Sequence, residues 1–139
     1  MGRPLGVTIL AAGMILAGVG FGAAGIAFLF MGSTGATASQ SGAVAALMTA
    51  VGAAAGVIFL FFGVVHVVLA IAVFQLRNVA RVLTIILFFV IAAGACLGLL
   101  ATLLSYSHVA LAWHVSILAL DALALWYLFR SQTKEAFHA

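Results

Sequence analysis

The stretch AVFQLRNVARVLTIIL at residues 72–87 joins two long apolar runs through a short basic turn. Its polar centre, QLRNVAR at 75–81, is so short that helices on either side of it must lie antiparallel as neighbours. Each flanking run reaches the roughly 20 residues that a helix needs to cross a bilayer. The stretch therefore predicts a transmembrane helical hairpin with an arginine-bearing turn.

The composition extends this prediction to the whole chain of 139 residues. Hydrophobic residues make up 68% and charged residues only 5%, and the interior of a soluble domain of this size is too small to bury so much apolar surface. Four apolar segments follow one another at about 5–31, 43–74, 82–104 and 109–129. We expect an all-α membrane protein whose single domain, 1–139, is an antiparallel bundle of four transmembrane helices.

The basic residues predict how the helices are threaded. Arg3 lies near the N-terminus, Arg77 and Arg81 lie in the second connection, and Arg130 and Lys134 lie in the C-terminal tail. Four spans would place these regions on one face, and the positive-inside rule then puts both termini in the cytoplasm. We expect a multi-pass protein of the prokaryotic inner membrane.

The same cations predict a partner. Arg77, Arg81, Arg130 and Lys134 could hold anionic lipid, at about 1 kcal/mol for each charge near the membrane surface. Five basic residues in the whole chain are too few for a nucleic-acid-binding face, so nucleic acid is not an expected partner.

Small residues recur every seven positions in the first two segments. Such rows let helix backbones approach closely, and packing drives helix association in a bilayer, where hydrophobicity does not. We favour packing of the first two helices against each other over a homodimer interface, which stays the alternative. The predicted helix-packing residues are Gly13, Gly20, Gly18, Gly25, Gly56 and Gly63.

Asp121 is the single carboxylate in the apolar run WHVSILALDALALWYLF at 113–129. An ionisable group at membrane depth is costly and needs a partner or water. At 1.5 Å per residue, Asp121 lies about 13 Å from Arg130 and His66 about 16 Å from Arg77 along their helices. We predict that Asp121 faces inward and pairs with His66. We favour a structural clasp, and a proton-coupled transport path is the alternative.

Two histidines also fit a tetrapyrrole-binding pattern. Ala110 lies four residues before His114, and Gly63 lies three residues before His66. This spacing is similar to the small-residue-to-histidine pattern of light-harvesting polypeptides and haem-binding bundles, in which the small residue lets a macrocycle approach the helix. Membrane histidines are more often structural, so we expect no cofactor. Haem or (bacterio)chlorophyll bound through His114 or His66 is the alternative.

Three stretches carry a resemblance: RPLGVTILAAG at 3–13, the turn at 72–87, and ALDALALWYLFRSQTKEAF at 119–137. Together they resemble small prokaryotic four-helix membrane proteins of unknown function, with an opening RPxGVTIL, a central LWxLxxWAR turn and a terminal YLxRPxVKxAF. Asn78 and Val79 replace the usual aromatic turn here. The resemblance implies the four-helix fold and no particular reaction or cofactor.

The chain lacks the residue patterns of known catalytic motifs. It has no HExxH, Walker loop, paired carboxylates or Ser-His-Asp order, so we expect neither an enzyme nor a metal site. Little of the chain lies outside the predicted spans, and packing rows are abundant. We therefore expect a non-enzymatic accessory or structural subunit that packs within a larger prokaryotic membrane protein complex. The alternatives are the proton-coupled transporter and the tetrapyrrole-binding subunit.

Overall fold

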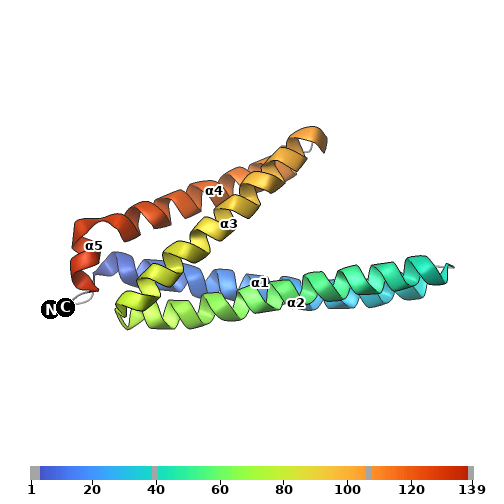
Figure 1. The fold of residues 1–139 in the computed structure, drawn as a ribbon, viewed down its shortest axis with the longest axis horizontal. Helices are drawn as coiled ribbons and strands as arrows, with labels where there is room; N and C mark the ends of the chain where they lie inside the picture. The colour runs from blue at the N-terminus through green and yellow to red at the C-terminus, as the bar shows by residue number, and fades with distance from the viewer. Residues whose placement is uncertain (1–3, 39–40, 106–107, 138–139) are drawn as a thin grey trace. The chain divides into compact units, whose positions relative to one another are not determined.

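The computed structural model describes residues 4–38, 41–105 and 108–137 (Figure 1). Within these ranges the chain is helical and contains no strand. The all-helical class is confirmed, and four of the described helices are long and apolar enough to span a membrane, as a multi-pass membrane protein requires. The helices are α1 (Leu5–Ala38), α2 (Gly42–Phe74), α3 (Asn78–Ser105), α4 (His108–Phe129) and the short α5 (Ser131–Ala136).

Helix α1 continues past its predicted end at residue 31. The sequence predicts a polar loop from residue 32, where the first apolar segment ends, and that prediction is wrong for 32–38. Neither a charge nor a proline interrupts the segment, and its hydroxyl groups bond back to the preceding turn. Ser33 Oγ donates to the Phe30 carbonyl at 2.8 Å, and Thr34 Oγ1 donates to the same oxygen at 3.0 Å. The polar side chains are therefore satisfied within the helix.

The turn between α2 and α3 is closed by two backbone hydrogen bonds. The Leu76 N–H donates to the Val73 carbonyl at 2.9 Å, and the Arg77 N–H donates to the Ala72 carbonyl at 3.2 Å. This pair is a Schellman motif, whose left-handed residue is usually glycine. Leu76 occupies that position with a φ of 57°. Its side chain packs against a buried cluster of the same unit, which offsets a backbone cost of about 1–2 kcal/mol.

Helix α3 starts at Asn78, four residues before the predicted start. The prediction placed Arg81 in a polar turn. Instead, Arg81 is buried and its Nε donates to the Leu128 carbonyl at 3.1 Å. Because this bond gives the Nε–H a partner inside the protein, the arginine can lie within the helix rather than in a polar turn. The short helix α5 was also not predicted.

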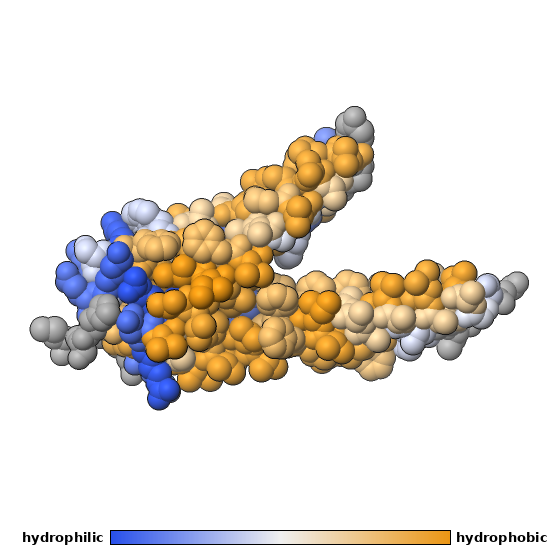
Figure 2. Space-filling view, viewed as in Figure 1, coloured by the Kyte–Doolittle hydropathy of each residue, from blue (hydrophilic) through white to orange (hydrophobic). Residues whose placement is uncertain are grey.

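The chain divides into two compact units. Unit 2 comprises residues 11–71, which belong to α1 and α2, and unit 1 comprises residues 1–10 and 72–139. Most large apolar side chains are exposed in both units, among them Leu16, Val57 and Leu100. Figure 2 shows this apolar surface and a group of hydrophilic residues at the end of unit 1 that carries α5. An apolar surface of this extent fits a lipid environment. The single-domain assignment stays a prediction.

In unit 1, α5 packs on a small buried core. Phe137, which follows α5, is 5% exposed and clusters with Val7, Val73 and Ala80. These residues come from the first turns of α1, the last turn of α2 and the first turn of α3. The tail therefore docks onto the unit and closes its end.

Candidate functional site

In unit 2, α1 and α2 meet along a row of glycines, which we name the glycine seam: Gly18, Gly25 and Gly32 of α1 and Gly52, Gly56 and Gly63 of α2. A Cβ atom built on Gly25 would lie 2.8 Å from the Gly56 carbonyl oxygen, and one on Gly63 would lie 2.8 Å from the Gly18 carbonyl oxygen. Real Cβ atoms essentially never come within 3.0 Å of another atom. The close approach of the two backbones therefore requires glycine at these positions.

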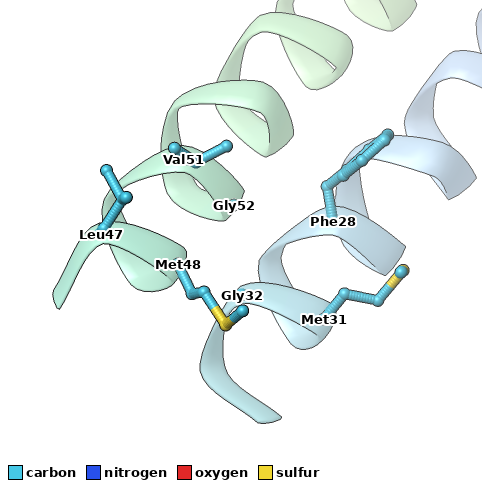
Figure 3. Close-up of a pocket in the computed structure, with 7 residues that line it drawn as sticks. All are labelled: Phe28, Met31, Gly32, Leu47, Met48, Val51 and Gly52. Carbon is cyan, nitrogen blue, oxygen red and sulfur yellow. The ribbon is translucent and has the colours of Figure 1, made fainter. Parts of the chain in front are cut away.

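The seam is bordered by two open apolar grooves. Figure 3 shows the first, where Gly32 of α1 and Gly52 of α2 face each other and Met48 extends toward Gly32. This groove has a volume of about 320 Å³ and the second about 280 Å³. Their linings carry no charged residue and are almost wholly apolar. The first is lined by Phe28, Met31, Gly32, Leu47, Met48, Val51 and Gly52, and the second by Gly18, Gly22, Leu60, Gly63, Val64, Val67 and Val68.

His66 lies beside the seam and is 2% exposed. Its Nδ1 lies 2.7 Å from the Phe62 carbonyl oxygen, and its ring centroid lies 5.0 Å from that of Phe21 on α1. Because a carbonyl oxygen only accepts, Nδ1 must carry a proton and donate it. With its proton on Nδ1, the neutral form of the ring would have Nε2 as its hydrogen-bond acceptor.

In unit 1, α3 and α4 are antiparallel (Figure 1), and His114 connects them. Its Nδ1 donates to the Ala110 carbonyl at 2.7 Å and lies 3.4 Å from Thr102 Oγ1 on α3. Thr102 Oγ1 in turn donates to the Gly98 carbonyl at 2.8 Å. A Cβ atom on Gly98 would collide with Nε2 of His114. The ring thus lies against the bare backbone of α3, and we name these four residues the histidine clasp.

The histidine clasp restricts the space in which His114 could coordinate the metal of a tetrapyrrole. A metal coordinated by imidazole sits about 2 Å from the nitrogen, and at Nε2 of His114 that space adjoins Gly98. The other ring nitrogen already donates to Ala110. This arrangement favours a packing role for His114. Among the described residues, no three His, Cys, Asp or Glu side chains gather in a way that could hold a metal ion.

Asp121 lies on the same face of α4 as His114 and Leu128, since it is seven residues from each. Both of those residues contact α3. Asp121 is 6% exposed, and its Oδ2 has no hydrogen-bond partner among the described residues. His66 belongs to unit 2 and Asp121 to unit 1, so their pairing stays a prediction.

The basic residues of unit 1 differ in their surroundings. Arg81 is buried and bonded to Leu128, whereas Arg77, Arg130 and Lys134 are exposed. The Arg130 guanidinium carbon lies 4.1 Å from the ring centroid of Trp126. Sequence reasoning missed the buried contact of Arg81, because spacing does not reveal which arginine turns inward.

Helix α1 carries a second set of small residues, which we name the outer stripe: Gly13, Gly20, Ala23 and Ala27. All four are exposed. No atom of the described residues lies within 4 Å of a Cβ built on Gly13 or Gly20. Helical geometry places the stripe on the side of α1 opposite Gly18 and Gly25. The structure therefore brings Gly18, Gly25, Gly56 and Gly63 together and leaves Gly13 and Gly20 apart from them.

Comparisons with protein-family models, with curated proteins and with solved structures find no match to this chain. The resemblance to small four-helix membrane proteins therefore stays a prediction. The function must be argued from the residues themselves.

Proposed function

We propose that this protein is a non-enzymatic accessory subunit of a larger membrane protein complex in a prokaryotic inner membrane, with both termini in the cytoplasm. The observation that supports the proposal is the outer stripe, whose Gly13 and Gly20 have open space beside them. In this proposal the stripe receives a helix of the partner.

The physical reason is the cost of glycine on a lipid-facing surface. Glycine weakens a helix interior by about 1 kcal/mol relative to alanine and presents no side chain to lipid. At a helix–helix contact, by contrast, small residues permit the close packing that drives association in a bilayer. The seam glycines serve this purpose within unit 2. Leu16, which is 74% exposed, stands on the same face as the outer stripe and would act as a knob between small residues.

The test is gentle purification from the native membrane, followed by mass spectrometry of everything that accompanies the protein. We expect a larger protein in fixed stoichiometry. Gly20→Leu should lose it, whereas Gly94→Leu should retain it, because Gly94 on α3 also has open space beside it but lies outside the stripe. Recovery of the protein alone would contradict the proposal, and recovery as a dimer would assign the stripe to a second copy.

A second function, proton-coupled transport, is supported by the unpartnered Oδ2 of the buried Asp121. Intramembrane carboxyl groups commonly mark ion or proton paths. The test is proton flux into vesicles that contain the purified protein and an entrapped pH-sensitive dye. Transport predicts flux that disappears in Asp121→Asn, because the amide cannot exchange a proton. Equal flux in both proteins, or none in either, would exclude this function for Asp121.

A further inference from the structure

One end of unit 1 carries three exposed cations: Arg77, Arg130 and Lys134. The bond from Arg81 Nε to the Leu128 carbonyl, at 3.1 Å, places the first turn of α3 beside the last turn of α4. Arg77 lies one turn before Arg81, whose N–H donates to the Arg77 carbonyl at 3.2 Å. Arg130 lies two residues beyond Leu128. Arg77 and Arg130 therefore extend past the same contact, and Figure 2 shows hydrophilic residues gathered there.

Lys134 continues this group along the chain. Its N–H donates to the Arg130 carbonyl at 3.0 Å, so it lies one turn further on, in α5. Arg77, Arg130 and Lys134 are exposed, whereas Arg81 is buried and bonded to α4. The three exposed cations are thus available to a ligand, and Arg81 holds the two helix ends together beneath them.

Arg130 contacts an aromatic side chain. Its guanidinium carbon lies over the ring of Trp126, which is 58% exposed. Tryptophan concentrates at the level of lipid headgroups. A cation–π contact uses none of the guanidinium N–H groups, so they stay available for bonds to phosphate. Phe129, 49% exposed, offers an apolar flank next to the charge.

We propose that Arg77, Arg130 and Lys134 bind the headgroup of an anionic phospholipid, with Arg81 as a positioning residue. The cations match the headgroup charge, and Trp126 and Phe129 match the start of the acyl chains. A free inorganic anion would use the cations alone and gain nothing from the apolar flank. The inference is independent of the accessory-subunit proposal, because it concerns residues of unit 1, whereas the outer stripe belongs to unit 2.

The experiment is native mass spectrometry of the detergent-purified protein with phosphatidylglycerol or phosphatidylcholine of identical acyl chains. Phosphatidylglycerol should bind more tightly. Each cation near the membrane surface contributes about a fivefold gain in affinity, so Arg130→Gln/Lys134→Gln should weaken phosphatidylglycerol binding by roughly 25-fold. Glu135→Gln is the matched control, because it removes a neighbouring charge of the opposite sign, and it should bind phosphatidylglycerol at least as tightly as the unaltered protein.

Circular dichroism establishes that each variant keeps its helices. If the double variant does not fold, Lys134→Gln alone should give the fivefold loss, since the Lys134 side chain is exposed. Equal binding of the two lipids, or unchanged binding by the variants, would overturn the proposal. Displacement of the lipid by inorganic phosphate at equal concentration would also overturn it, because the site would then be one for free anions.

Discussion

In unit 2, α1 meets α2 through glycines that bring the two backbones together, whereas in unit 1 α3 meets α4 through side chains that reach across. A Cβ on Gly25 would stand 2.8 Å from a carbonyl oxygen of the facing helix. His114 and Arg81 instead place polar groups of one helix against the other. Both solutions fit a bilayer, where packing and hydrogen bonds must replace hydrophobic attraction between helices.

The two kinds of helix contact predict different sensitivities to substitution. A backbone contact cannot move aside for an added side chain, so the seam should be intolerant of any residue larger than glycine. A polar side-chain contact loses one hydrogen bond when it is removed, and the rest of the interface stays in place. Mutations should therefore have larger effects in the seam than in the histidine clasp.

The largest effect is expected for Gly25→Leu in the seam. The added side chain would meet the Gly56 carbonyl and Leu60, and such overpacking costs about 3 kcal/mol. Gly20→Leu, on the other face of the same helix, has open space for its side chain and should stabilise the helix by up to about 1 kcal/mol. Unfolding of the detergent-solubilised protein by titration with dodecyl sulfate measures both. Equal losses would contradict the assignment of the two faces.

A smaller loss is expected for Arg81→Met in unit 1. The methionine keeps the length of the side chain but leaves the Leu128 carbonyl without its donor, at a cost of about 2 kcal/mol. Arg77→Met is the matched control, because Arg77 is exposed and one turn away. The same titration compares them. If the two variants behave alike, the bond between Arg81 and Leu128 does not join α3 to α4.

Asp121→Leu should stabilise the protein. A buried polar atom without a partner costs about 1–3 kcal/mol, and leucine removes it from the face of α4 that His114 and Leu128 share. A destabilisation of about 3–5 kcal/mol would instead reveal a paired charge. The predicted partner is His66, and a double-mutant cycle with His66→Phe would then measure their coupling.

The smallest effect is expected for Thr102→Val in the histidine clasp. The substitution removes a hydroxyl that lies 3.4 Å from Nδ1 of His114. Hydrogen bonds between membrane helices average about 0.6 kcal/mol, and the expected loss is below that value, because the Nδ1 proton of His114 is shared with the nearer Ala110 carbonyl. Thr8→Val, at an exposed position of α1, should have no measurable effect. A loss as large as that of Gly25→Leu would reverse the contrast between the two units.

The four long helices were predicted well from the sequence. A long apolar segment in a bilayer must satisfy its own backbone hydrogen bonds, and a helix does so. The sequence-based prediction was wrong at 32–38. There the hydroxyl groups of Ser33 and Thr34 donate to a carbonyl of the preceding helical turn, so these polar side chains do not need water as a hydrogen-bond partner. The sequence predicted helix packing for Gly13 and Gly20 as well as for Gly18 and Gly25, but only Gly18 and Gly25 lie against α2. Gly18 and Gly13 look alike in sequence, and only the position of α2 distinguishes them.

The candidate contacts of unit 1 were harder to predict. Gly98 and Thr102 on α3, and Ala110 and His114 on α4, are spaced by one helical turn, but that spacing recurs in many pairs of small residues. Arg81 and Arg77 share the same turn, and the sequence does not show which one is buried. Such choices depend on which helix ends are neighbours, and that follows from the fold.

Site-specific crosslinking in the native membrane tests the central claim most directly. That claim is that the glycine seam packs α1 against α2, whereas the outer stripe binds a partner. A photoreactive side chain replaces Ala23 in the stripe or, as the control, Val57 on α2, which is 61% exposed. We predict that position 23 crosslinks to one larger membrane protein and that position 57 crosslinks to lipid. If position 23 also crosslinks only to lipid, the outer stripe is no docking surface and the accessory-subunit account is wrong.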